Sequence, residues 1–190
     1  MSSLILASQS PRRKELLQQI QLSFSVISST VDETFSSDLM PHEVVMYLAR
    51  KKAKEISLQH PTDYVIGSDT VVTKEGLILG KPESKEEAKK MLMMLSGSTH
   101  AVYTGVAILY GEVEELFYEK TDVTFWELTP EEIDDYIASE EPFDKAGSYG
   151  IQGIGAKFVK EIKGDYFSVV GLPISRVNRT LIDMGYLRPE

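Results

Sequence analysis

The sequence contains no cysteine, which excludes disulfide bonds, thiolate metal sites and a cysteine nucleophile. Its three histidines, His42, His60 and His100, are scattered without the spacing of metal ligands, so a zinc site is not expected. No apolar run approaches the roughly 20 residues that a membrane-spanning helix needs, and the chain begins with a strand-like segment rather than a secretory signal. We therefore expect a cytoplasmic protein with no membrane partner.

Positive charge is also scarce. The 190 residues carry 20 lysines and arginines against 29 acidic residues, which gives a net charge of −9. Because a protein that binds the nucleic-acid backbone needs a basic face, we expect no nucleic-acid partner. Basic residues do cluster at residues 12–14 and 50–54, and such clusters suit a small phosphorylated ligand. The length is that of a single domain over residues 1–190.

The hydrophobic pattern predicts an α/β protein with a mixed sheet, because both hairpins and strand–helix units occur. Strands are expected at residues 4–7, 24–28, 64–72, 77–80, 101–110, 115–127, 157–162 and 166–170, the last two forming a hairpin. Helices are expected at about residues 11–20, 41–60, 85–95, 130–139 and 173–184. A glycine-rich structured loop is expected at residues 143–155.

The first strand leads into a polar turn and a helix that begins with two arginines. Ser10 suits the N-cap and Pro11 the first helical position. Arg12 and Arg13 then lie at the positive end of the helix dipole, which is unfavourable unless an anion binds there. This segment therefore predicts a phosphate-binding strand–turn–helix. The alternative is a solvent-facing pair of arginines on an ordinary capped helix.

Asp69 is the strongest candidate for a catalytic residue. It interrupts an apolar strand, where a carboxylate is costly to bury unless it binds a cation or a positive side chain. The alternative is that Asp69 caps a local turn beside Gly67 and Ser68. Lys52 lies close to the apolar face of the second expected helix, and a buried stem with a solvated head is its simplest explanation.

Several enzyme classes lack their motifs in this sequence. There is no Gly-x-Ser-x-Gly, no Gly-x-Gly-x-x-Gly after a strand and no Walker loop. Carboxylates, lysines, arginines and hydroxyl groups remain. They suit phosphate chemistry assisted by Mg²⁺ or Mn²⁺, with the cation held by one or two carboxylates and by substrate phosphate oxygens.

Five segments in order resemble the motifs of the Maf family of nucleoside triphosphate pyrophosphatases. They are ASQSPRR (7–13), GSDTVV (67–72), LGKP (79–82), DKAGSYGIQG (144–153) and GDYFSVVGLPIS (164–175). The resemblance implies a Maf/inosine-triphosphatase-like fold, in which helices flank a bent mixed sheet and a central cleft separates two lobes. It also implies hydrolysis of a nucleoside triphosphate between the α and β phosphates, a required divalent cation, and a homodimer.

The resemblance assigns roles to the matching residues. Asp69 matches the catalytic residue described as the proton acceptor that activates water, and a direct metal contact by Asp69 or Glu33 is left open. Phosphate binding or support of the site is implied for Ser8, Arg12, Arg13, Lys52 and Lys81. Base selection is implied for Arg12, Thr70 and Gln152.

Thr70 and Gln152 resemble the family branch that is selective for dTTP and UTP. A glutamine amide offers the donor and acceptor that suit the O4/N3–H edge of thymine or uracil. The branch that acts on 7-methyl-GTP typically has glutamine after the aspartate and lacks the YGIQG segment. Ser68 departs from the dTTP/UTP pattern, which usually has alanine there, while the 7-methyl-GTP branch tends to have serine.

We therefore expect a dTTP/UTP pyrophosphatase that can also clear modified pyrimidine nucleotides. The nearest alternative is a pyrophosphatase for 7-methyl-GTP or for a broad range of triphosphates. An alternative of another class is a nucleotide-sensing regulator of cell division.

Overall fold

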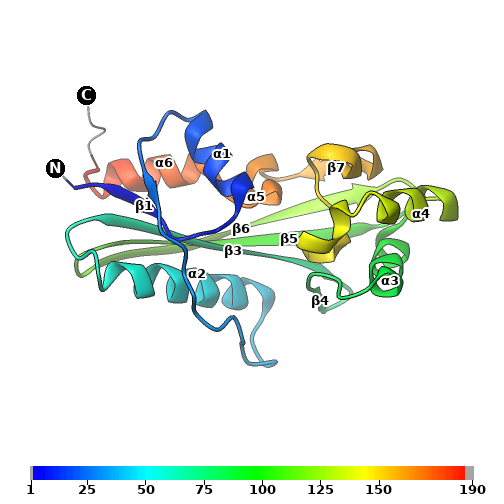
Figure 1. Cartoon of the computed structure of the whole chain (residues 1–190), viewed down its shortest axis with the longest axis horizontal. Helices are drawn as coiled ribbons and strands as arrows, with labels where there is room; N and C mark the ends of the chain where they lie inside the picture. The colour runs from blue at the N-terminus through cyan, green and yellow to red at the C-terminus, as the bar shows by residue number, and fades with distance from the viewer. Residues whose placement is uncertain (1, 187–190) are drawn as a thin grey trace. The chain divides into compact units, whose positions relative to one another are not determined.

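The structure is a computed structural model that describes residues 2–186, along which strands and helices alternate (Figure 1). The strands are β1 (Leu4–Leu6), β2 (Ser25–Val26), β3 (Tyr64–Lys74), β4 (Leu77–Leu79), β5 (Thr99–Tyr110), β6 (Val113–Phe125) and β7 (Val159–Lys163). The α-helices are α1 (Pro11–Gln19), α2 (Pro41–Ser57), α3 (Lys85–Leu95), α4 (Pro130–Ala138), α5 (Tyr166–Val170) and α6 (Ile174–Asp183). Three 3₁₀ helices overlap the expected glycine-rich loop, namely η1 (Glu141–Asp144), η2 (Ala146–Ser148) and η3 (Gly153–Phe158).

In this part of the chain seven strands form one mixed sheet. Its order is β2-β1-β3-β5-β6-β7, with β4 paired to β3. Strand β1 is parallel to β2 and to β3, whereas β4 is antiparallel to β3 and β7 is antiparallel to β6. The expected α/β class with a mixed sheet is therefore confirmed. Between residues 2 and 186, no helix combines the length and the hydrophobicity that crossing a membrane requires.

The chain divides into two compact units. Unit 1 holds the residues up to Asp69, the segment Thr104–Glu119 and the residues from Gly171 on, while unit 2 holds Thr70–Tyr103 and Lys120–Val170. The boundaries fall inside β3, β5 and β6, so each of these strands contributes residues to both units. This division agrees with the expected two lobes. The central cleft and the single functional domain stay predictions.

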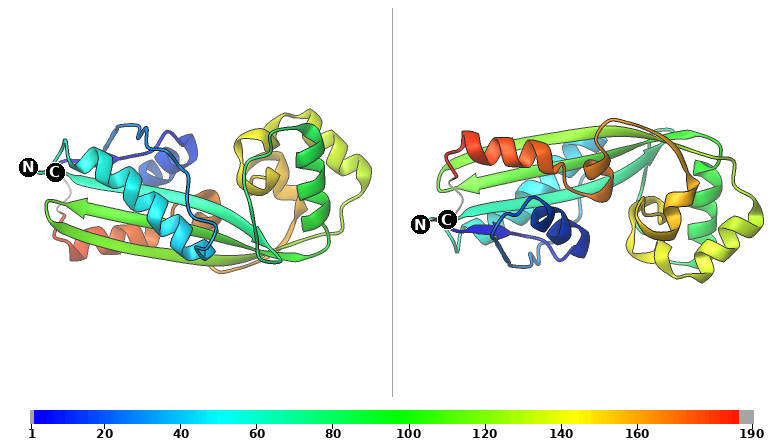
Figure 2. Two further views of the ribbon diagram at one scale, coloured as in Figure 1. Left: turned by 90° about the horizontal axis from the view of Figure 1, so that it is seen from below. Right: turned by 90° about the horizontal axis from the view of Figure 1, so that it is seen from above.

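In unit 1 the sheet lies between α2 on one face and α1 with α6 on the other (Figure 2). Gly67 of β3 and Gly105 of β5 allow α2 to approach closely. A Cβ atom on Gly67 would lie 2.2 Å from the carbonyl oxygen of Ala49, and one on Gly105 would lie 2.4 Å from that of Val45. The contacted atoms belong to the backbone of α2 and cannot move away as a flexible side chain could. Helix α2 therefore packs this closely only because both strands have glycine at these positions.

Unit 2 has a core of its own, rich in aromatic side chains. The rings of Phe125 and Tyr149 lie 4.6 Å apart, and those of Tyr136 and Phe158 lie 4.9 Å apart, both edge to face. Helix α3 packs against α4 and η2. Edge-to-face aromatic pairs of this kind stabilise a core beyond the area that they bury.

The predicted helix starts are confirmed, because Ser10, Ser84 and Thr129 are the N-caps of α1, α3 and α4. In each case the side-chain oxygen accepts a hydrogen bond from the backbone N–H group three residues later. The sequence pattern of a polar residue before an apolar helical stripe was therefore sufficient to locate these ends.

The expected strand at residues 166–170 is wrong, since these residues form α5. Asp165 Oδ1 accepts a hydrogen bond from the Phe167 N–H group at 2.9 Å, and the Asp165 carbonyl oxygen accepts one from the Ser168 hydroxyl at 2.8 Å. These bonds favour a helical turn, and periodicity cannot distinguish so short an apolar run from a strand. The predicted hairpin is absent from the described chain, and β7 pairs with β6 instead. The strand expected at residues 24–28 shortens to Ser25–Val26.

Candidate functional site

A buried lysine and two carboxylates form the centre of the candidate site in unit 1. Lys52 Nζ lies 2.7 Å from Asp69 Oδ1 and 3.0 Å from Glu33 Oε1. The side chains of Lys52 and Asp69 are only 10% and 11% exposed, whereas that of Glu33 is 62% exposed. The expectation of a solvated Lys52 head is therefore wrong. The turn-cap alternative for Asp69 is wrong as well, because β3 continues through this residue.

The packing of α2 on β3 explains how Lys52 reaches Asp69. The helix turn at Ala49–Ala53 lies against Gly67, and Lys52 belongs to that turn. Asp69 follows Gly67 by two residues, so both face α2, because side chains alternate along a strand. Each charge balances the other in a place where either one alone would be costly.

The same helix holds the loop that carries Glu33. Glu55 accepts hydrogen bonds from the hydroxyl and the backbone N–H group of Thr30, at 2.7 and 2.9 Å. Lys51 Nζ donates to the carbonyl oxygen of Asp32 at 2.6 Å. Glu33 follows directly in the chain, so α2 provides Lys52 and also orders the loop that brings a second carboxylate to it.

Arg13 is anchored at the start of α1. Its Nε donates to the carbonyl oxygen of Gly171 at 2.8 Å, and its Nη1 donates to the hydroxyl of Ser8 at 3.4 Å. Burial lowers the pKa of Arg13, an effect that the nearby Asp69 carboxylate opposes and the Arg12 guanidinium reinforces. An arginine nevertheless stays charged at neutral pH. Arg13 is therefore held within electrostatic reach of Asp69, and the solvent-facing alternative is wrong for this residue.

The first turn of α1 retains the features of an anion site. It contains no acidic residue, and the Ser10 side chain accepts a hydrogen bond from the Arg13 N–H group at 3.5 Å. Arg12 is half-buried in the same turn, and Ser8 is buried just before it. Backbone N–H groups, hydroxyl groups and guanidinium groups at the positive end of a helix can bind phosphate oxygens.

Ser68 has a local structural explanation. Its buried hydroxyl lies 2.9 Å from the carbonyl oxygen of Gly105 and 3.2 Å from that of Gly171. As the neighbour of Asp69 in β3, its side chain faces the opposite side of the sheet. The carbonyl group of Gly171 thus accepts hydrogen bonds from both Ser68 and Arg13.

The other predicted site residues belong to unit 2: Thr70, Lys81 and Gln152. Lys81 and Gln152 are exposed, and Thr70 is half-buried. The segments that carry them meet at Gly147, whose N–H group donates to the Gly80 carbonyl oxygen at 3.0 Å. A Cβ atom on Gly147 would lie 2.9 Å from the Val72 side chain. Unit 2 thus brings these three segments together at Gly147.

Sequence reasoning missed the residues that hold these segments in place. Glu55 is the acidic residue directly after the basic cluster at residues 50–54, one helical turn from Lys51. This spacing could have indicated that Glu55 interacts with neighbouring groups. Glu141 stands two residues before the expected glycine-rich loop, and its carboxylate accepts hydrogen bonds from the backbone N–H groups of Ile154 and Gly155 inside that loop. Nothing local in the sequence indicates these contacts, because the chain must first fold back on itself.

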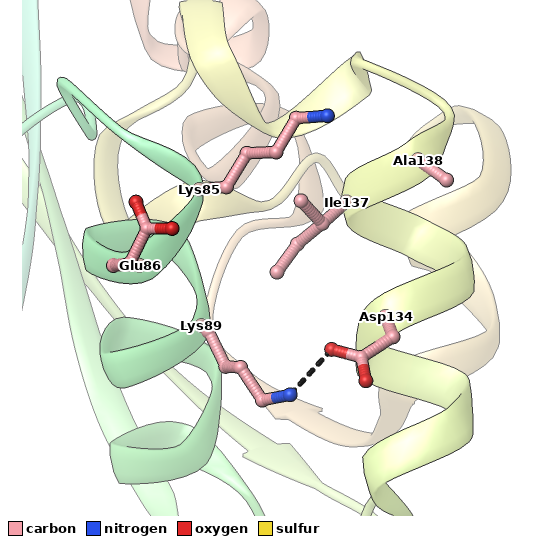
Figure 3. A pocket seen from close by; sticks show the side chains of 6 residues that line it. All are labelled: Lys85, Glu86, Lys89, Asp134, Ile137 and Ala138. Carbon is pink, nitrogen blue, oxygen red and sulfur yellow. Dashed lines mark hydrogen bonds and ion pairs between the residues drawn. The ribbon is translucent and has the colours of Figure 1, made fainter.

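A separate pocket in unit 2 lies between α3 and α4 and has a volume of about 290 Å³ (Figure 3). Its lining residues are Lys85, Glu86, Lys89, Asp134, Ile137 and Ala138. Lys89 Nζ lies 2.6 Å from Asp134 Oδ1, so the two charges neutralise each other at the pocket wall. The predicted site residues are not among those that line it, and we do not assign it to the reaction.

The candidate site fits a divalent cation only together with a substrate. Between residues 2 and 186 there is no cluster of three or more acidic, histidine or cysteine side chains that could hold a metal ion. Asp69 and Glu33 nevertheless both contact the Lys52 ammonium group. Two carboxylates suffice for Mg²⁺ or Mn²⁺ where phosphate oxygens and water supply the other ligands.

A mixed α/β fold whose site combines carboxylates, a buried lysine and arginines at a helix start is typical of proteins that act on phosphate groups. The chain belongs to the Maf family, since the family model described as Maf-like protein matches residues 3–184. The family resemblance of its five motifs is thereby confirmed.

Curated relatives in three Bacillus species are similar to almost the whole chain, and each is named dTTP/UTP pyrophosphatase. One Bacillus cereus relative is 57% identical over 181 residues, which are 95% of each chain. A Bacillus anthracis relative is 58% identical and a Bacillus cytotoxicus relative 57% identical, with the same coverage.

Two solved structures are more distant. The Ham1 protein of Staphylococcus aureus is 15% identical with a TM-score of 0.47, covering 83% of this chain and 80% of that one. The nucleoside-triphosphatase / dITP/XTP pyrophosphatase of Mycobacterium abscessus is 12% identical with a TM-score of 0.45, covering 96% and 98%. At these values neither likeness bears on function.

Proposed function

We propose that this protein hydrolyses dTTP and UTP to the nucleoside monophosphate and pyrophosphate. The observation that carries the proposal is the identity of 57–58% over 95% of the chain to relatives that are named dTTP/UTP pyrophosphatase. The site in unit 1 supports it, because it contains a carboxylate poised for proton transfer and several groups that suit phosphate oxygens.

Asp69 is the proposed general base. Lys52 binds its Oδ1 at 2.7 Å and so holds the carboxylate in one orientation. The carboxylate takes a proton from a water molecule whose oxygen attacks the α phosphorus. The bond from that phosphorus to the α–β bridging oxygen breaks, and pyrophosphate leaves. Phosphate oxygens are bound by Ser8, Arg12, Arg13 and Lys81, which offset the charge that develops on them.

Asp69 and Glu33 would hold the divalent cation, Mg²⁺ or Mn²⁺, jointly with the substrate phosphates. When bound there, such a cation lowers the pKa of the attacking water and neutralises phosphate charge. Carboxylate oxygens, which these cations prefer as ligands, are provided by the exposed Glu33 and the buried Asp69.

Arg12, Thr70 and Gln152 are the proposed contacts to the base. The Gln152 side chain is exposed and can offer its amide to the O4/N3–H edge of thymine or uracil. Ser68, the departure toward the 7-methyl-GTP branch, binds two carbonyl groups inside unit 1. Its identity therefore has a structural reason that does not involve the base.

The family relationship also supports three proposals about the protein as a whole. We propose that residues 1–190 act as one domain, that the protein forms a homodimer, and that it works in the cytoplasm. Light scattering of the purified protein measures the oligomeric state directly, and a mass of one chain would exclude the homodimer.

A nucleotide panel tests the proposed reaction. The purified protein is incubated with dTTP, UTP, dCTP, dGTP and 7-methyl-GTP in Mg²⁺ or Mn²⁺ and then in EDTA, and pyrophosphate and orthophosphate are measured separately. We expect pyrophosphate release that is fastest with dTTP and UTP and is abolished by EDTA.

Each other outcome of the panel contradicts a different part of the proposal. A preference for 7-methyl-GTP would keep the reaction and overturn the base assignment. Release of orthophosphate would overturn the cleaved bond. Nucleotide binding without turnover would favour the sensor of cell division, and Asp69→Asn protein purified in parallel controls for contaminating enzymes.

A further inference from the structure

The carboxylate of Glu141 is bound on both of its oxygens. Oε2 accepts a hydrogen bond from the Ile154 N–H group at 3.0 Å, and Oε1 accepts one from the Gly155 N–H group at 3.1 Å. The Tyr136 hydroxyl also donates to Oε1, at 2.9 Å. Burial acts to raise the pKa of Glu141, but the hydrogen bonds from Ile154, Gly155 and Tyr136 and the charge of Lys145 together hold that pKa below its ordinary value.

These contacts give Glu141 the function of a helix cap. Ile154 and Gly155 belong to the first turn of η3 (Gly153–Phe158), whose N–H groups need partners because the helix itself supplies none. Gln152 stands at the N-cap position, yet in the described chain its side chain makes no cap hydrogen bond. Glu141 caps η3 in its place, so the Gln152 amide is available to a ligand.

The segment is fastened on both sides of Gln152. On one side the Gly150 N–H group donates to the Tyr136 hydroxyl at 3.2 Å, and on the other side Glu141 binds the start of η3. Tyr136 is fully buried in α4 and is therefore a rigid anchor. A Cβ atom on Gly153 would lie 2.7 Å from Glu141 Oε2, which shows how closely the carboxylate packs on this backbone.

We infer that Glu141 is a positioning residue for base recognition, which acts by holding Gln152 in place. The inference rests on the proposed function, in which Gln152 contacts thymine or uracil. A glutamine on a fixed backbone presents its amide donor and acceptor in one arrangement and so discriminates between bases. A glutamine on a mobile backbone can turn its amide to match either arrangement of donor and acceptor on a base. Loss of the Glu141 contacts therefore lowers base preference and leaves the phosphate chemistry of the unit 1 residues intact.

The test compares four proteins: wild type, Glu141→Gln, Gln152→Ala and the double variant. Glutamine keeps the size of Glu141 but turns an NH₂ group toward a backbone donor. The readout is kcat/KM for dTTP divided by that for dCTP, whose N4 group is a donor where thymine has the O4 acceptor. We expect this ratio to fall roughly tenfold in each single variant, because a tenfold change corresponds to the free energy of about one hydrogen bond. In the double variant the ratio should fall no further than in a single variant.

Two further measurements separate positioning from general damage. Hydrogen exchange of the amides of residues 153–155 is expected to speed up in Glu141→Gln, while kcat/KM for dCTP stays unchanged. Tyr136→Phe removes the hydroxyl donor to Glu141 and is expected to act in the same direction, which provides a second variant should Glu141→Gln fail to fold. Glu161→Gln, an exposed residue of β7, is the charge-matched control and is expected to leave the ratio unchanged.

The possible failures are distinguishable. If Gln152→Ala lowers the ratio while Glu141→Gln changes neither the ratio nor the exchange, the inference is overturned and the proposed function stands. Losses that add in the double variant also overturn it, because the two residues then act independently. If Gln152→Ala leaves the ratio unchanged, or wild type releases no pyrophosphate, the base assignment or the proposed function fails, and the inference fails with it.

Discussion

Asp69 and Lys52 depend on each other for their burial in unit 1. An ionised group loses its hydration when it is buried, and the cost reaches several kcal/mol unless a partner of opposite charge is present. The pair is 2.7 Å apart, and the exposed Glu33 contacts the same ammonium group at 3.0 Å. This arrangement holds a carboxylate at the centre of the site, where it can act as a general base.

Replacing Asp69 by asparagine tests this role. Asparagine can still accept a hydrogen bond from Lys52 but cannot take a proton, so we expect pyrophosphate release from dTTP to fall by about 10²- to 10⁴-fold. Binding of dTTP, measured by titration calorimetry, should persist. Asp38→Asn, in an exposed part of unit 1, is the control and should retain full activity. Retention of more than about a tenth of the activity by Asp69→Asn would exclude general-base catalysis by this residue.

Helix α2 is the element on which the unit 1 site depends. Its close approach to β3 and β5 brings Lys52 to Asp69, and its Lys51 and Glu55 hold the loop of Glu33. A displacement of α2 would therefore disturb the buried ion pair and the loop together. The glycines of the two strands set how near the helix can lie.

Gly67→Ala tests the importance of this approach. Its Cβ atom would meet backbone atoms of Ala49 and Ala53 at 2.2 and 2.8 Å, so α2 has to move. We expect the free energy of unfolding, measured in urea, to fall by about 1–3 kcal/mol or more, and pyrophosphate release to fall as Lys52 leaves Asp69. Gly80→Ala, whose Cβ would meet nothing within 4 Å, is the control and should keep wild-type stability. Equal stability of the two variants would show that α2 does not pack as closely as described.

At the scale of the whole molecule, each unit encloses a core of its own, and the core of unit 2 contains a titratable pair. His100 Nε2 lies 2.7 Å from the Tyr149 hydroxyl, while its Nδ1 has no hydrogen-bond partner among the described residues. Burial, reinforced by the Lys74 charge and opposed by Asp122, lowers the pKa of His100 from 6.5 to about 4. The folded protein thus keeps this histidine neutral where the unfolded chain would protonate it.

Stability is therefore expected to depend on pH between 6.5 and 4. The contribution of His100 is fully present above pH 6.5 and is lost as the pH falls toward 4, because the unfolded state then binds the extra proton. The lowered pKa corresponds to about 3 kcal/mol. The free energy of unfolding is measured in urea at pH 7 and at pH 4, for wild type and for the variant with both His100→Phe and Tyr149→Phe. Between these pH values it should fall more in wild type than in the variant, by about this amount. Equal falls in the two proteins would mean that His100 is not buried as a neutral side chain.

Local patterns were enough to predict much of this structure. The starts of α1, α3 and α4, where Ser10, Ser84 and Thr129 are the N-caps, follow from residues within a few positions of each other. Residues 166–170 were the failure, because five residues carry too little periodicity to separate a strand from a helix. The helix at residues 166–170 is favoured by two hydrogen bonds to Asp165, one from the Phe167 N–H group and one from the Ser168 hydroxyl.

The sequence by itself determined the family, the order of the elements except α5, and the presence of a costly carboxylate at Asp69, because ordered motifs and local hydrophobic patterns can be read without a partner. Only the tertiary structure decided what balances Asp69, what anchors Arg13 and what caps the helix after Gln152. Those answers are Lys52, Gly171 and Glu141. The physical reason is that each contact joins residues that the chain brings together only by packing, and such packing depends on distant details such as a glycine at position 67.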